Sequence, residues 1–454
     1  MPNRTPQTEL RRDLGAWAAA SIVVGTVIGS GIFLVPRTMI QRVGSVPMVF
    51  AVWVAGGVLS LAGALSYAEL AAAMPEAGGE YVYLREAYGP IWGFLYSWTQ
   101  MWVAKSGSIA TLATGFFLYF ADFVPQLDSV FYTLHAPLGP HGGPLEFRYG
   151  QVAAIVLILG LAWLNYFGVK VGGEVQTAVT VLKVALIAMV IVVGLMLGHP
   201  HASNVGAVAP LTLAGFVAAL VAALWAYDGW NNVGMVASEV RRPQSNLPRA
   251  LIGGTAGVIG IYLLANSAYF YVLSRQEVAG STRVAADMMG KILGNAGAHA
   301  VSLAAMISIF AALNGSILSG ARVPYAAARE GYFFAPLATV HPQHHTPSLS
   351  IVALSLWSCL LVLSGKYDDL FNLVIFASWI LYGMTAAAVI VLRVKRPNMP
   401  RPYRTVGYPV VPLLFIAGSI ILLVSTFFDR LRESLMGMGI MAVGLPFYFY
   451  WKKR

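Results

Sequence analysis

Four long stretches of this chain contain no charged residue, and they limit its fold more than any other feature. They are residues 14–36, 43–68, 192–227 and 371–392. A helix needs about 20 mainly apolar residues to cross the hydrocarbon layer of a membrane. Charged residues make up 11% of the chain, whereas soluble domains carry about 25%. The sequence therefore predicts an all-α polytopic membrane protein, because the short alternating segments of a transmembrane β-barrel are absent.

We expect twelve transmembrane helices. Their approximate ranges are 14–39, 47–71, 91–120, 150–168, 174–198, 211–238, 250–273, 296–323, 346–364, 370–393, 409–428 and 433–451. Residues 1–13 lack the apolar core and the small-residue cleavage site of a signal peptide. We therefore expect the first span to direct the chain to the membrane.

Lysine and arginine are distributed unevenly over the loops between these spans. With a cytoplasmic N-terminus, the inner segments carry 18 of the 29 basic residues and the outer segments carry 9, while Lys105 and Lys183 lie within spans. The positive-inside rule then predicts that both termini are cytoplasmic and that the protein is a multi-pass protein of the plasma membrane. The net charge of +10 reflects this topology and contact with the lipid bilayer, so we expect no nucleic-acid partner.

Two of the spans contain residues that weaken a helix at mid-membrane. The first span has glycines at positions 25, 29 and 31 around Ser30, and the sixth has Asp228 and Gly229 followed by two asparagines. Each glycine costs about 1 kcal/mol relative to alanine inside a helix. Small residues often serve close helix packing in membranes, but here they coincide with polar side chains. We interpret both places as breaks in the helix.

The two breaks are five spans apart, so their helices run in opposite directions. Matching breaks in oppositely directed helices are typical of an inverted repeat with a binding site at its centre. The sequence predicts one repeat over 14–198 and a second over 211–393, with two peripheral spans over 409–451.

A broken helix exposes backbone groups that an intact one hides. The N–H groups of Ser30, Gly31 and Ile32 begin the outer half of the first span and favour a carboxylate. Carbonyl groups near Trp225 and Asp228 end the outer half of the sixth span and can accept from an ammonium group. The breaks therefore predict a site for a zwitterion. The predicted binding residues are Thr26, Val27, Gly29, Ser30, Gly31, Ile32, Trp225, Ala226, Tyr227, Asp228, Trp230 and Asn231.

Three charged residues lie deep within predicted spans, where each is costly and needs a partner or a role. Lys183 lies near the middle of the fifth span, and we favour a functional role in which it donates to freed carbonyls of the first span. Asp228 either serves function, by contacting the substrate amine or by relaying a proton, or caps the inner half-helix. Lys105 either faces the cavity or pairs with a polar neighbour, and we favour the structural pairing.

Motifs of enzymes are absent from the sequence. It contains no HExxH, GxxxxGK[ST] or GxSxG pattern, so we expect no enzymatic activity and no cofactor. Cys359 is the single cysteine, which rules out an internal disulfide. The histidines within His341–His345 fall in a loop, where we favour a solvated segment over a metal site.

Four segments together resemble the amino acid–polyamine–organocation superfamily, and within it the L-type amino acid transporter family. They are GTVIGSGIF, PEAGGEYVYLREAYG, LWAYDGWNNVGMVASEVRRPQSNLPRAL and ALNGSILSGARVPYAAARE. The resemblance implies a LeuT-type fold of five plus five inverted repeats, with broken helices 1 and 6. It also implies that Lys183 occupies the place of a sodium ion, with Gly29 and Ser316 as its contacts. Trp225 matches an aromatic gate.

The expected function is a sodium-independent L-amino-acid transporter that works by alternating access, with neutral amino acids favoured. Exchange and proton coupling both remain open. Asp228 stands where many family members carry a small neutral residue, so a cationic amino acid or polyamine carrier is the alternative. From a different class, the alternative is an amino-acid sensor on a transporter scaffold. Animal members of the family often pair with a second subunit through an extracellular cysteine, so we expect a stand-alone bacterial permease without a disulfide-linked heavy subunit.

Overall fold

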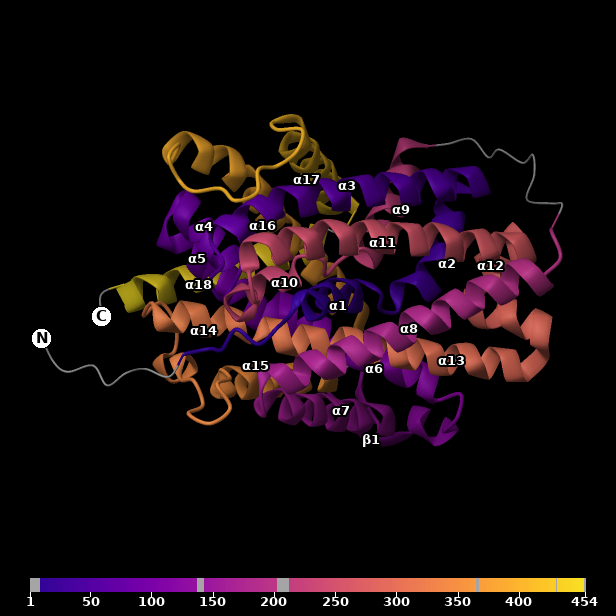
Figure 1. Ribbon diagram of the computed structural model, residues 1–454. Coiled ribbons are helices and arrows are strands. Elements are labelled where there is room, and N and C mark those ends of the chain that lie inside the picture. Colours follow the sequence, from indigo (N-terminus) through magenta and orange to yellow (C-terminus); the bar gives the residue numbers. More distant parts are fainter. Residues whose placement is uncertain (1–8, 137–142, 202–211, 365–366, 430, 453–454) are drawn as a thin grey trace, which may run out of the picture.

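The computed structural model describes residues 9–136, 143–201, 212–364, 367–429 and 431–452, and most of them are helical (Figure 1). Residue 211, the predicted start of the second repeat, lies outside these ranges, as do the basic residues Arg4, Lys366, Arg430, Lys453 and Arg454. The α-helices are α1 (Ala16–Val27), α2 (Gly31–Val43), α3 (Val46–Ala73), α4 (Glu80–Tyr88), α5 (Pro90–Thr99), α6 (Lys105–Phe120), α7 (Tyr149–Tyr166), α8 (Val169–Leu197), α9 (Leu213–Ala226), α10 (Asn232–Met235), α11 (Pro243–Val272), α12 (Arg275–Gly280), α13 (Val284–Gly320), α14 (Arg322–Arg329), α15 (Ser348–Leu363), α16 (Tyr367–Lys395), α17 (Val410–Asp429) and α18 (Leu431–Lys452). Strands β1 (Val130–Leu134) and β2 (Leu145–Arg148) pair antiparallel.

Eight of the described helices are long and apolar enough to cross a membrane, and the bent pair α1 and α2 makes a ninth span. The polytopic all-α class is thus confirmed. In three further predicted spans, the described residues form no single helix that is long enough to cross a membrane. A π-helix over Gln100–Ala104 separates α5 from α6, while α9 has 14 residues and α15 has 16. These three segments are the difference between nine spans and the predicted twelve.

The lipid-facing helices show the surface expected in a membrane. α8 and α17 carry large exposed apolar side chains, including Val181, Met196, Ile420 and Phe428. A soluble protein rarely exposes apolar patches of this extent. α17 packs against α3 and α16, and α18 packs against α5 and α16, so both lie at the side of the bundle.

The broken segments lie at the centre of the bundle. α1 is surrounded by α8, α10, α11 and α13, and α2 packs against α9 (Figure 1). Leu14, just before α1, pairs with Val240 in an isolated parallel bridge. This packing brings the start of the chain beside the segment that follows the second break.

A buried ion pair lies beside this bridge between Leu14 and Val240. The guanidinium of Arg322 donates to both carboxylate oxygens of Glu239 at 2.7 and 3.0 Å, and both side chains are almost completely buried. Removing one partner of such a pair typically costs about 3–5 kcal/mol, because the other charge is left unpaired. The pair therefore holds α14 against the turn Ala237–Glu239.

Candidate substrate site

The first break separates α1 from α2, which are bent by 40° relative to each other. The amide of Gly29 turns back to the carbonyl of Val27 at 2.8 Å, so the carbonyl of Gly25 loses its normal helical partner. α2 then begins at Gly31, and its first N–H groups have no earlier carbonyl in the helix to bond. The glycine–serine–glycine sequence makes this interruption inexpensive.

Lys183 occupies the carbonyl side of the first break. Its side chain is completely buried, and its Nζ donates to the carbonyl oxygens of Gly25 at 2.7 Å and Ile28 at 2.5 Å. Ser308 of α13 donates to the same Ile28 oxygen at 2.9 Å. A buried charge needs such partners. The predicted donation from Lys183 to freed carbonyls of the first span is therefore present.

The contacts of Lys183 differ from those that the resemblance implied. Its ammonium group donates to the carbonyl oxygens of Gly25 and Ile28, whereas the resemblance implied Gly29 and Ser316. The Gly25 oxygen can accept from Lys183 because the amide of Gly29, its normal helical partner, donates to Val27 instead. Ser316 lies eight residues beyond Ser308 on α13, about 12 Å along a helix, and lines the cavity.

The second break follows α9, which ends at Ala226, and precedes the four-residue helix α10. Gly229 has a φ of +110°, a conformation that glycine adopts readily and other residues rarely adopt. Its carbonyl oxygen lies 2.8 Å from the Thr26 hydroxyl. Thr26 therefore ties α1 directly to the second break.

The two breaks approach each other closely. A Cβ atom at Gly31 would lie 2.8 Å from the Cα of Ala226, which no side chain tolerates without displacement. The hydroxyl of Tyr262, on α11, lies 2.8 Å from the carbonyl oxygen of Ala226 and 3.1 Å from that of Val27. Tyr262 is completely buried. One hydroxyl thus joins the carbonyl ends of α1 and α9.

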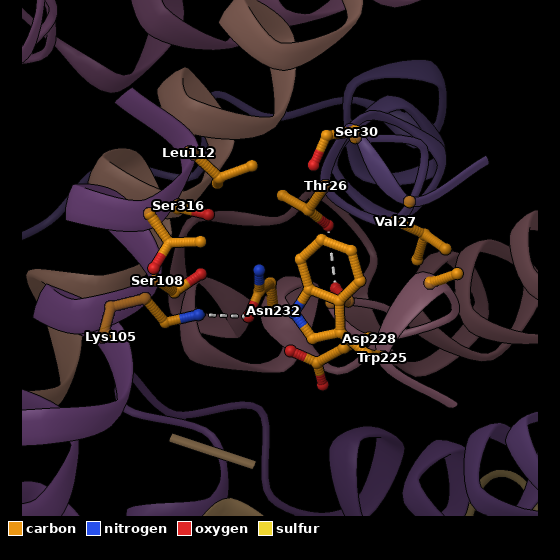
Figure 2. A pocket seen from close by; sticks show the side chains of 15 residues that line it. Thr26, Val27, Ser30, Lys105, Ser108, Leu112, Trp225, Asp228, Asn232 and Ser316 are labelled. Carbon is orange, nitrogen blue, oxygen red and sulfur yellow. Dashed lines mark hydrogen bonds between the residues drawn. The ribbon is translucent and has the colours of Figure 1, made fainter. Parts of the chain in front are cut away.

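A cavity of about 50 Å³ lies between the two breaks (Figure 2). Nine of the predicted residues line it: Thr26, Val27, Gly29, Ser30, Gly31, Trp225, Ala226, Asp228 and Ser316. Six other lining residues were not among the predicted binding residues: Lys105, Ser108, Thr111, Leu112, Gly229 and Asn232. Four of these six lie on α6, and among them only Lys105 was singled out from the sequence, as a charge within a span.

Four predicted binding residues do not line this cavity. Ile32 is completely buried in α2. Tyr227 donates to the carbonyl of Trp53 at 3.2 Å, and Trp230 packs edge-on against Tyr67, with ring centroids 4.7 Å apart. Asn231 donates to the buried carboxylate of Glu80. Tyr227, Trp230 and Asn231 support the second break from the side away from the cavity, whereas Ile32 belongs to α2. The role of all four in binding stays a prediction.

Two opposite charges face the cavity, Lys105 from the start of α6 and Asp228 from the turn between α9 and α10. The Nζ of Lys105 donates to the Oδ1 of Asn232 at 2.7 Å, and Tyr382 donates to Asp228 at 3.1 Å. Figure 2 shows the Lys105 amine and the Asp228 carboxylate on either side of Asn232. The two charges interact electrostatically. Lys105 therefore combines both roles considered from the sequence, because it lines the cavity and pairs with a polar neighbour.

Among the described residues, no group of three or more His, Cys, Asp or Glu side chains could hold a metal ion. His341 and His344 stack on each other with ring centroids 4.5 Å apart. His345 lies 3.0 Å from the carbonyl oxygen of Glu9. Cys359 is a free, buried cysteine.

Known proteins resemble this chain over nearly its whole length. A family model described as amino acid permease matches residues 14–445. The serine/threonine exchanger SteT of Bacillus subtilis is 35% identical, with 99% of each chain covered. The human large neutral amino acids transporter small subunit 2 is 32% identical over 98% of this chain and 82% of its own length. The human b(0,+)-type amino acid transporter 1 is 33% identical over 97% of this chain and 88% of its own. This chain belongs to the amino acid permease family.

Proposed function

We propose that this member of the amino acid permease family carries neutral L-amino acids across the plasma membrane without sodium, by alternating access. The observation that carries the proposal is the meeting of two helix breaks at one cavity. The N–H groups at the start of α2 favour a carboxylate. The carbonyl end of α9 and the side chain of Asp228 favour an ammonium group. An amino acid presents both groups on adjacent atoms.

Lys183 supports sodium independence. Its ammonium binds the carbonyl oxygens of Gly25 and Ile28, and carbonyl oxygens freed at half-helix ends coordinate the coupling ion in ion-coupled transporters. A lysine that already fills this position leaves no vacant carbonyl set for sodium there. Transport in this proposal is driven either by exchange for a second amino acid or by coupling to protons.

The paired charges of the cavity favour neutral side chains. Asp228 alone would favour a cationic substrate, but Lys105 faces the same cavity and offsets its charge. The serine/threonine exchanger and the large neutral amino acids transporter agree with this choice through their names. A cationic amino acid or polyamine carrier is the second candidate function, because the Asp228 carboxylate lines the cavity.

The proposed topology has twelve spans with both termini in the cytoplasm. Residues 14–198 and 211–393 would form the two LeuT-type inverted repeats, and 409–451 the peripheral pair. The mammalian relative is named a small subunit. For this chain we propose a stand-alone permease, because its single cysteine is buried and offers no external disulfide. The same scaffold used as a sensor would bind amino acids without moving them.

Counterflow in proteoliposomes tests the proposal. Vesicles loaded with unlabelled serine or leucine should take up the corresponding labelled amino acid equally well in sodium and in choline buffer. A competition panel of the twenty amino acids should show inhibition by neutral ones and little by arginine or putrescine. Strict sodium dependence would refute the role of Lys183, binding without uptake would favour the sensor, and selective inhibition by arginine or putrescine would favour the cationic carrier.

A further inference from the structure

A second cavity, of about 520 Å³, lies between the start of α11 and the segment that precedes α17. Gln244, Ser245 and Arg249 line it from α11, and Tyr403 lines it from the other side. α11 and α17 are both candidate membrane spans. The cavity therefore opens where two spans begin, at the level of a membrane interface.

Arginines without a carboxylate partner lie in the lining of this cavity and next to its lining residues in the sequence. Arg249 lines it, and Arg242 and Arg404 lie next to lining segments in the sequence. All three are exposed, and none has an ion-pair partner among the described side chains. Other arginines on this side of the molecule are paired, such as Arg322 with Glu239 and Arg401 with Glu69. The cavity lining itself includes no carboxylate.

A strip of helix surface without side chains, which we call the groove, continues from the cavity along the outer face of α11. Gly253 lines the cavity, and Gly257 and Gly260 follow at the spacing of one helix face. All three are exposed, and a Cβ atom at any of them would meet open space. The helix surface here lacks side chains along about two turns. An extended hydrocarbon chain fits such a groove.

We propose that this cavity and groove bind one anionic glycerophospholipid. The Arg249 guanidinium takes the phosphate, because its planar N–H groups match phosphate oxygens. Gln244, Ser245 and Tyr403 surround the headgroup with hydrogen-bonding groups, and an acyl chain lies along Gly253, Gly257 and Gly260. Basic pockets between membrane helices are known to recognise anionic headgroups. The proposal does not depend on which amino acid the protein carries.

The test uses the purified full-length protein, stripped of lipid in detergent, and measures lipid retention by native mass spectrometry. Dioleoylphosphatidylglycerol should bind in a one-to-one complex, and dioleoylphosphatidylcholine should bind more weakly. Arg249→Gln should weaken phosphatidylglycerol binding about fivefold, the share expected of one arginine near anionic lipid. Gly253→Leu should weaken binding of both lipids, because its side chain fills the groove.

Matched controls come from exposed positions elsewhere. Arg42→Gln at the end of α2 and Gly160→Leu on the outer face of α7 should leave lipid binding unchanged. Thermal unfolding checks that every variant is folded. Inorganic phosphate, at millimolar concentration, should not displace the lipid. The proposal is overturned if folded Arg249→Gln and Gly253→Leu retain phosphatidylglycerol like the controls, if phosphatidylcholine binds equally well, or if free phosphate competes for the site.

Discussion

The two helix breaks look alike in the sequence but are stabilised in different ways. At the first break, a protein ammonium and a hydroxyl already bind the freed carbonyl groups, through Lys183 and Ser308. At the second break, the carbonyl of Gly229 meets Thr26, and the Asp228 carboxylate is held by Tyr382. At the first break, a buried ammonium group binds the freed backbone carbonyls. At the second break, the charged group is a side-chain carboxylate that faces the cavity.

This difference assigns separate tasks to the two breaks. The first offers the substrate its N–H groups, because Lys183 has filled its carbonyl side. The second carries Asp228 and Asn232 into the cavity beside Lys105, where side chains decide between substrates. We therefore expect substitutions at the first break to abolish transport of every substrate, and substitutions at the second to change the preference among them.

The largest effect is expected for Lys183→Ala. The variant leaves the carbonyls of Gly25 and Ile28 without partners, and each lost hydrogen bond to a charged group is worth about 1.5–3 kcal/mol. We expect counterflow to fall about 100-fold or more for all substrates, while expression persists. Lys170→Ala is the control, because Lys170 lies on the same helix and its side chain is 68% exposed. Unchanged uptake kinetics in Lys183→Ala would remove the lysine from the mechanism.

A smaller and more selective effect is expected at the second break. Asp228→Asn keeps the size of the side chain but leaves Lys105 uncompensated, so neutral uptake should fall about tenfold and inhibition by aspartate or glutamate should increase. Lys105→Gln should shift the preference in the opposite direction, toward arginine. Competition assays on both variants measure the shift. Loss of all uptake in both, with no change in preference, would show that the two charges serve the fold alone.

Tyr262→Phe should have the smallest effect. The variant removes the hydroxyl that joins the carbonyl ends of α1 and α9 and keeps the aromatic packing. One hydrogen bond contributes about 0.5–1.5 kcal/mol, so we expect KM to rise about threefold to tenfold with the same substrate preference. Ser267→Ala is the control, because its hydroxyl bonds only within α11, to the carbonyl of Leu263. A KM equal to that of the control would mean that the two breaks are not coupled through Tyr262.

The backbone of the site was predictable, and its side-chain lining was only partly so. Glycine and polar residues inside apolar runs located both breaks, since few other segments combine low helix propensity with membrane depth. Lys183 was found for the same reason, as a charge too deep to reach water. The lining residues Ser108, Thr111 and Leu112 were missed, although Ser108 and Leu112 share a helix face with Lys105, because the sequence alone favoured a structural pairing for that lysine. Trp230 and Asn231 lie within the second break, yet their side chains pack against Tyr67 and Glu80 and do not line the cavity.

The sequence by itself determined that this is a helical membrane protein, where two of its helices break, and which charges lie in the membrane. Hydropathy, glycine content and depth are local properties, and they can be read along the chain. The tertiary structure alone decided that Lys183 binds the carbonyls of Gly25 and Ile28, that Tyr262 joins the two breaks, and that Lys105 faces Asp228. Those contacts join residues more than 100 positions apart or depend on helix rotation, and packing fixes both.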